Sequence, residues 1–122
     1  MAIKVLVADE LPEVTDLLQF YLSKNEKYAP ILTTNCVDDV IRIVGSERPD
    51  LIFIDTLWHG NLRGLDIYTS IKADDHDGTY YPVVIGISAS PDFKPLWNNK
   101  GVPFLLKPIS LGSLRETLES VL

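Results

Sequence analysis

The sequence predicts an α/β domain in which a parallel sheet of five strands is covered by helices on both faces. Five short apolar runs alternate with amphipathic segments along the 122 residues, and this alternation is typical of parallel sheets with right-handed crossovers. Three of the runs are nearly continuous in Val, Ile and Leu, as expected of strands buried on both faces. The length suits one domain over residues 1–122.

The five apolar runs are the predicted strands because each is short and is followed by polar or turn-forming residues. The first three lie in the N-terminal half of the chain, and the last two in its C-terminal half. In chain order the predicted strands are Ile3–Ala8, Ala29–Thr33, Leu51–Ile54, Val83–Ile87 and Val102–Leu106.

Helices are predicted where apolar residues recur three and four positions apart. The first follows Pro12 and carries its apolar stripe through residues 14–22. The second centres on residues 40–44 and is expected to stop near Gly45 and Pro49. The third follows Gly64, and the last begins at Leu111 and continues to the end of the sequence.

The segment between the last two strands is the weakest helical pattern. Pro91 and Pro95 interrupt it, so a shortened or irregular fourth helix is expected. The polar stretch Ala73–Thr79 predicts an exposed loop before the fourth strand.

Charge and cysteine content exclude several classes of function. With 17 acidic and 11 basic residues the net charge is -6, which argues against a nucleic-acid partner and against anionic lipid. No run approaches a membrane span, and no signal peptide is expected. The single cysteine, Cys36, makes neither an internal disulfide nor a zinc CxxC pair, so a cytoplasmic location is expected.

Chemically capable residues stand at the carboxyl ends of four predicted strands, where open α/β sheets form their sites. They are Asp9 and Glu10 after the first strand, Asp55 after the third, Ser88 after the fourth and Lys107 after the fifth. Carboxylates brought this close need a counter-charge, and Mg²⁺ binds one or two carboxylates with water and phosphate oxygens. Since a carboxylate can form an acyl phosphate, the set indicates a magnesium-dependent aspartyl-phosphorylation site.

Simpler interpretations exist for each residue alone. An Asp after an apolar strand is commonly a turn or helix-cap residue, and Asp9 with Glu10 could cap the first helix. Lys107 alone would be a solvated lysine. The coincidence at four strand ends favours a functional site.

The sequence resembles the receiver domain of two-component response regulators. Four segments carry the resemblance, in the order expected of that family: VLVADELPEV, RPDLIFID, VVIGISA and FLLKPIS. The resemblance implies a flavodoxin-like fold with strand order 2-1-3-4-5, the order that the chemotaxis regulators share. It also implies that the chain is not an enzyme beyond assisting its own phosphorylation and dephosphorylation.

The resemblance implies a role for each site residue. Asp55 would be the phosphoacceptor, with Lys107 and Ser88 contacting the phosphoryl group. Mg²⁺ would be held by Asp9, Glu10, Asp55 and the backbone carbonyl of Leu57. Phe104 stands where the family has a switching aromatic, and the Lys107–Pro108 bond would be cis.

The implied partners are a sensor histidine kinase or a phosphotransfer protein. Output would pass to a downstream effector domain or to a homodimer formed through the face of the fourth helix, fifth strand and fifth helix. The chain departs from the family pattern in having Glu10, in the proline-free segment DTLWHGNLRG after the third strand, and in its interrupted fourth helix.

Three other functions compete with this interpretation. A phosphate-independent interaction module, a pseudo-receiver, would fit the altered loop and fourth helix. A flavin-binding protein would need a phosphate-cradling loop after the first strand, but ADELPEV is acidic and has no glycine. A small phosphatase would need a second catalytic acid in a DxD motif, which the sequence lacks.

Four further residues invite interpretation. Trp58 is either a lid or a buried loop anchor, and Trp97 is either part of a partner surface or core. His59 is expected to be solvated rather than a ligand, and Cys36 to be a small buried hydrophobe.

Overall fold

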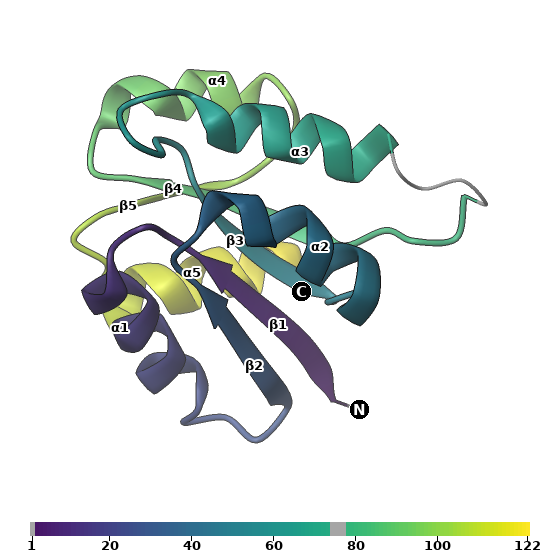
Figure 1. The fold of residues 1–122 in the computed structure, drawn as a ribbon. Coiled ribbons are helices and arrows are strands. Elements are labelled where there is room, and N and C mark those ends of the chain that lie inside the picture. Colours follow the sequence, from purple (N-terminus) through teal and green to yellow (C-terminus); the bar gives the residue numbers. More distant parts are fainter. Residues whose placement is uncertain (1, 74–77) are drawn as a thin grey trace.

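Five parallel strands form one sheet in the order β2-β1-β3-β4-β5 (Figure 1). The computed structural model describes residues 2–73 and 78–122. The predicted fold class and strand order are confirmed. The strands are β1 (Ile3–Ala8), β2 (Tyr28–Thr34), β3 (Leu51–Asp55), β4 (Val83–Ser88) and β5 (Phe104–Leu106).

Helices cover both faces of the sheet, α1 and α5 on one and α2, α3 and α4 on the other (Figure 1). A 3₁₀ turn over Pro91–Phe93 leads directly into α4, so the predicted short fourth helix is confirmed. The helices are α1 (Pro12–Leu22), α2 (Val37–Glu47), α3 (Arg63–Ala73), α4 (Lys94–Asn98) and α5 (Leu111–Val121).

The core divides into two clusters because successive strand residues point to opposite faces. In β1, Val5 and Val7 pack with residues of α1 and α5. Leu6 and Ala8 pack with residues of α2, α3 and α4 on the other face. All four side chains are fully buried, which explains why this strand shows no apolar–polar alternation.

Element boundaries differ from the predictions at a few places. β5 starts only after Pro103, which has no amide proton for the sheet. α2 continues through Gly45 and ends at Glu47, and its C-cap Arg48, with a left-handed φ of 48°, stands directly before Pro49. α3 already includes Gly64 in its first turn.

Two further expectations meet different outcomes. Cys36 is exposed, so its predicted burial is wrong: it precedes α2 at the end of the edge strand β2, where one side is open. Of the predicted loop Ala73–Thr79, Ala73 ends α3 and residues 74–77 lie outside the described residues.

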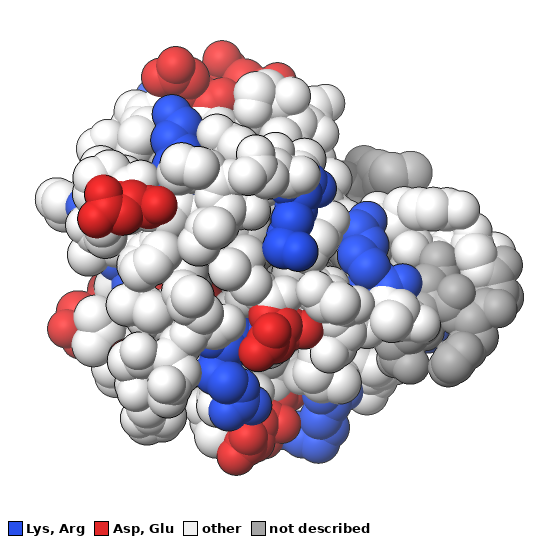
Figure 2. All heavy atoms as spheres, turned by 90° about the horizontal axis from the view of Figure 1, so that it is seen from above, with Lys and Arg blue, Asp and Glu red and all other residues white. Residues whose placement is uncertain are grey.

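The surface mixes both signs of charge. Figure 2 looks down on the side of α3 and α4, where Lys and Arg side chains lie interspersed with Asp and Glu. Within the described ranges, no helix has the length and apolar character that crossing a bilayer requires.

Candidate functional site

The predicted site residues lie at the carboxyl edge of the sheet, where β1 and β3 are neighbours. The chain goes from β1 to the edge strand β2 and returns to β3 on the other side of β1, so helices leave β1 and β3 toward opposite faces. This reversal is the place where open α/β sheets bind ligands. Asp9 directly follows β1, and Asp55 is the last residue of β3.

One lysine bridges these two carboxylates. Lys107 Nζ lies 2.6 Å from Asp9 Oδ2 and 3.3 Å from Asp55 Oδ1. Both acids are almost fully buried, and the side chain of Lys107 is 12% exposed. The Lys107 amide donates to Ser88 O at 2.8 Å, and the Lys107–Pro108 bond is cis as expected. The structure therefore brings together three residues from three strand ends.

Burial and a second acid make Asp55 a weak acid. Desolvation, reinforced by the nearby negative charge of Asp9, raises the pKa of Asp55 from 3.8 to about 7, although Lys107 opposes the shift. Two carboxylates facing one ammonium leave one negative charge uncompensated. The site is therefore short of positive charge.

Asp9 divides its two oxygens between a structural and an electrostatic contact. Oδ1 accepts a hydrogen bond from the Leu11 amide at 2.9 Å, which orders the turn before α1. The N-cap of α1 is Leu11 and makes no side-chain cap bond, so Asp9 supports the helix only indirectly. Oδ2 is buried and forms the ion pair with Lys107 but accepts no hydrogen bond from the described residues.

Glu10 does not join the two buried acids. Its Oε2 accepts a hydrogen bond from the His59 amide at 2.9 Å and lies 3.9 Å from His59 Nδ1. The His59 backbone is left-handed, with φ of 51°, and its side chain is 83% exposed, as expected for a solvated histidine. The loop after Asp55 therefore holds the Glu10 carboxylate away from the two buried acids.

The remaining predicted residues surround this centre. Ser88 is buried at the end of β4, one residue past Ile87, which pairs with Asp55 in the sheet. Its Oγ accepts a hydrogen bond from the Ser90 amide at 3.1 Å. Leu57 is half-buried in the turn after β3. Phe104 is half-buried and packs against the core cluster on the side of α3 and α4.

Sequence reasoning missed a group of hydrogen bonds that fixes the end of β3. Trp58 Nε1 donates to Asp55 O at 2.9 Å, and Trp97 Nε1 donates to Thr56 Oγ1 at 2.8 Å. The amide of Gly64 donates to Thr56 O at 3.1 Å, and a Cβ on Gly64 would overlap the Asp55 carbonyl. Both tryptophans are buried, which decides their open interpretations in favour of a loop anchor and core. The sequence signal that could have predicted these hydrogen bonds is the polar Thr56 directly after the predicted strand and its acid.

The comparison with protein families agrees with this geometry. The model of the response regulator receiver domain matches residues 5–119. The chain is a response regulator receiver domain. Its place is therefore in two-component signalling, and the resemblance carried by the four sequence segments is confirmed.

Several solved structures share the fold. The N-terminal domain of an uncharacterized protein from Wolinella succinogenes is 30% identical with a TM-score of 0.77, covering 98% of this chain and 93% of that one. The chemotaxis response regulator CheY4 of Vibrio cholerae is 18% identical with a TM-score of 0.81 and full coverage of both chains. The BeF₃-activated receiver domain of RstA from Klebsiella pneumoniae is 20% identical with a TM-score of 0.76, covering 96% of each chain.

The acid site of this receiver domain suits a divalent cation only in part. The buried Asp9 Oδ2 without a hydrogen bond and the uncompensated negative charge fit a hard cation with one or two carboxylate ligands. Among the described residues, no three His, Cys, Asp or Glu side chains cluster closely enough to hold a metal. Asp9 and Asp55 therefore fit as ligands, and Glu10 would have to leave the His59 amide to join them.

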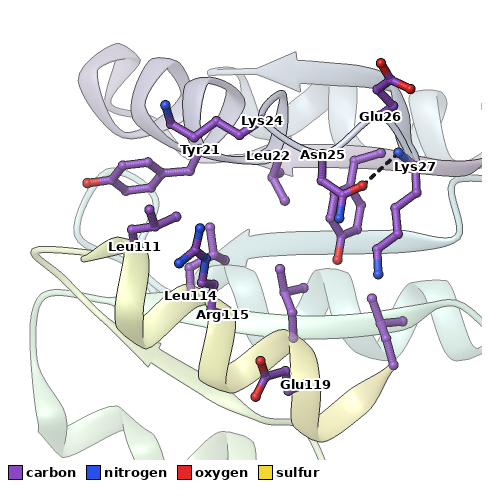
Figure 3. Close-up of a pocket in the computed structure, with 13 residues that line it drawn as sticks. Tyr21, Leu22, Lys24, Asn25, Glu26, Lys27, Leu111, Leu114, Arg115 and Glu119 are labelled. Carbon is purple, nitrogen blue, oxygen red and sulfur yellow. Dashed lines mark hydrogen bonds between the residues drawn. The ribbon is translucent and has the colours of Figure 1, made fainter.

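The large hollow of the receiver domain lies elsewhere. A cavity of about 800 Å³ opens between the end of α1, the loop that follows it and α5. Figure 3 shows Tyr21 and Lys24 on one wall and Leu111 and Arg115 on the other. None of the predicted site residues lines it, so the acid site is a small polar centre at the sheet edge.

Proposed function

We propose that Asp55 accepts a phosphoryl group from the phosphohistidine of a sensor histidine kinase or a phosphotransfer protein. The observation that supports this most strongly is the pair of buried carboxylates, Asp9 and Asp55, held by the single ammonium of Lys107. An ion pair of this kind at the end of a parallel strand, in a receiver domain, provides a nucleophile and a cation for the incoming phosphoryl group.

The transfer exchanges one bond for another. An oxygen of the Asp55 carboxylate attacks phosphorus, and an O–P bond forms as the P–N bond of the phosphohistidine breaks. The electron pair of the broken bond stays on the imidazole nitrogen. Lys107 Nζ, already 3.3 Å from Asp55 Oδ1, pairs with the phosphoryl oxygens, which carry developing negative charge.

Asp9, Asp55, the Leu57 carbonyl and, after turning inward, Glu10 would hold Mg²⁺, which would supply further charge neutralisation when bound. The residues themselves orient the reaction. Asp9 keeps the Lys107 ammonium between the two strands, and burial excludes bulk water from the Asp55 carboxylate.

The switch consists of Ser88 and Phe104. The Ser88 hydroxyl would donate to a phosphoryl oxygen in place of its present contact with the Ser90 amide. Phe104, half-buried beside α4, would move inward. The readout surface is then formed by α4, β5 and α5, facing an effector domain or a second copy.

Phosphorylation with a small donor tests the proposal. Incubation with acetyl phosphate and Mg²⁺ is expected to add the mass of one phosphoryl group to the protein. Asp55→Asn is expected to abolish the gain, because an amide is not a nucleophile here. Asp16→Asn, at an exposed position on α1, is the matched control and keeps it. A wild-type protein that gains no mass overturns the proposal.

A phosphate-independent interaction module is the second candidate. The contact between Glu10 and the His59 amide favours it, because it removes one expected metal ligand from the site. Titration with Mg²⁺, followed by intrinsic fluorescence, separates the two functions. Binding in the millimolar range or tighter supports the phosphorylated receiver, whereas the absence of binding supports the interaction module.

A further inference from the structure

One buried hydrogen bond holds α4 in place. The helix has five residues, and Trp97 is its buried residue. A helix this short is not stable through its own hydrogen bonds. Its position above the sheet therefore depends on the contacts of the Trp97 side chain, which is fully buried.

The contacts of the Trp97 ring are specific. Gly86 of β4 lies against the indole so closely that a Cβ there would overlap the ring. Tyr68 of α3 meets it edge-on, with ring centroids 6.0 Å apart. The indole Nε1–H points to Thr56 Oγ1 at 2.8 Å. The ring therefore has little freedom to shift while that hydrogen bond is made.

Thr56 links Trp97 to β4 through further hydrogen bonds. Its hydroxyl accepts from Trp97 and donates to Ile87 O at 2.8 Å, and its amide donates to the same carbonyl at 2.9 Å. Thr56 directly follows Asp55, and Ile87 directly precedes Ser88. Trp97 is thus hydrogen-bonded to Thr56, and Thr56 to Ile87. These two residues are the chain neighbours of the proposed phosphoacceptor and of the proposed mobile hydroxyl.

We infer that Trp97 is a positioning residue that couples the location of α4 to phosphorylation of Asp55 through the Thr56 hydroxyl. The inference rests on the proposed function and is separate from the Ser88–Phe104 pair. When Ser88 moves toward a phosphoryl group, the Ile87 carbonyl moves with it, and Thr56 follows. The buried indole N–H must keep its acceptor, so α4 follows as well. By linkage, whatever change loading makes in the strength of this hydrogen bond is returned, as the same factor, in the affinity of the site for a phosphoryl mimic.

Four substitutions isolate this hydrogen bond. Thr56→Val keeps the shape but removes the hydroxyl, and Trp97→Phe keeps an aromatic ring but removes the N–H donor. Thr56→Ser restores the hydroxyl. Tyr80→Phe is the matched control, because it removes an aromatic donor whose bond to Pro49 O, at 2.6 Å, lies at the opposite end of β3.

The measurement is loading with beryllium fluoride, a phosphoryl mimic, in the presence of Mg²⁺. In the wild type, the Trp97 Nε1–H resonance in ¹H–¹⁵N spectra is expected to shift on loading. Thr56→Val and Trp97→Phe should change the half-saturating concentration in the same direction, by about threefold to tenfold. Thr56→Ser and Tyr80→Phe should stay within about twofold of the wild type. The double variant should match the single ones, since they remove the same bond.

The outcomes separate the two levels of the argument. Two results overturn the inference and leave the proposed function intact. In the first, the wild type loads but its Trp97 resonance stays unchanged. In the second, Thr56→Val and Trp97→Phe load with the same half-saturating concentration as the wild type. A wild type that does not load overturns both. The wild-type resonance requires no substitution, so it decides the question even where a variant fails to fold.

Discussion

Asp55 sits in an environment that disfavours its charged form. Its carboxylate is buried next to a second carboxylate, Asp9, and one lysine serves both. The raised pKa of Asp55, about 7, means that the folded protein holds a proton there more tightly than the unfolded chain does. Stability contributed by that proton is complete below pH 4 and is lost as the pH rises through 7.

The pH dependence of stability is therefore a first prediction. Without divalent cations, the free energy of unfolding of the wild type should fall between about pH 4 and 7, and Asp55→Asn should remove most of this fall. At pH 7 the variant should be more stable by about 1–3 kcal/mol, and at pH 4 the difference should be small. Urea unfolding across this pH range measures it. An equal pH dependence in both proteins would contradict the raised pKa of Asp55.

The sequence predicted the positions of those site residues that directly follow or end a strand. Asp9, Asp55 and Lys107 meet because parallel strands bring their carboxyl ends to one edge. The orientation of Glu10 was not predictable, since it depends on the His59 amide and thus on the backbone path of a loop.

At the scale of elements, α3 begins in contact with the site. Gly64 of α3 lies against the carbonyl of Asp55 with no room for a Cβ, whereas Gly45 of α2 has open space around it. Both glycines are helical, so helix propensity alone would make either Gly→Ala substitution favourable. Because a Cβ fits at Gly45 but not at Gly64, the Gly→Ala substitution is expected to be favourable only at Gly45.

This pair of glycines gives a second prediction. Gly45→Ala should stabilise the protein by about 0.5–1 kcal/mol. Gly64→Ala should destabilise it by about 1–3 kcal/mol, because α3 must move away from the end of β3. Thermal unfolding of the two variants checks this. Stabilisation by Gly64→Ala would show that α3 does not pack as closely as described.

The shortness of α4 could be predicted from Pro91 and Pro95, but its attachment could not. A tryptophan in a short helix can face a partner protein or the core, and the sequence alone does not say which. Only the tertiary hydrogen bond to Thr56 shows that Trp97 faces the core. Long periodic segments such as α1 and α5 were predictable because the apolar stripe itself determines which side faces the sheet.

At the scale of the whole molecule, we expect the acid site to make stability depend on divalent cations. A cation bound by Asp9 and Asp55 would relieve their repulsion and would bind the folded chain only. The two-sided core follows from the alternation of the sequence, and the strand order was implied by the family resemblance, whereas this charge imbalance appears only after folding.

The third prediction follows from that linkage. Mg²⁺ at about 100 times its Kd should stabilise the wild type by about 2.7 kcal/mol. Asp9→Asn should lose most of the effect, and Asp16→Asn, at an exposed position on α1, should retain it. Thermal unfolding with Mg²⁺ and with a chelator measures the difference. Equal stabilisation of all three proteins would place the bound cation elsewhere.

The contact between Gly86 and Trp97 also restricts how the sequence can vary. A side chain at position 86 and an indole at position 97 exclude each other, so Gly86→Ala alone should cost about 1–3 kcal/mol. Trp97→Leu should cost less in the Gly86→Ala background than in the wild type, as measured by thermal unfolding of the four proteins of the double-mutant cycle. Related chains with a larger residue at the first position are expected to carry a smaller one at the second. The two positions should therefore change together during divergence, since either change alone passes through a poorly packed protein.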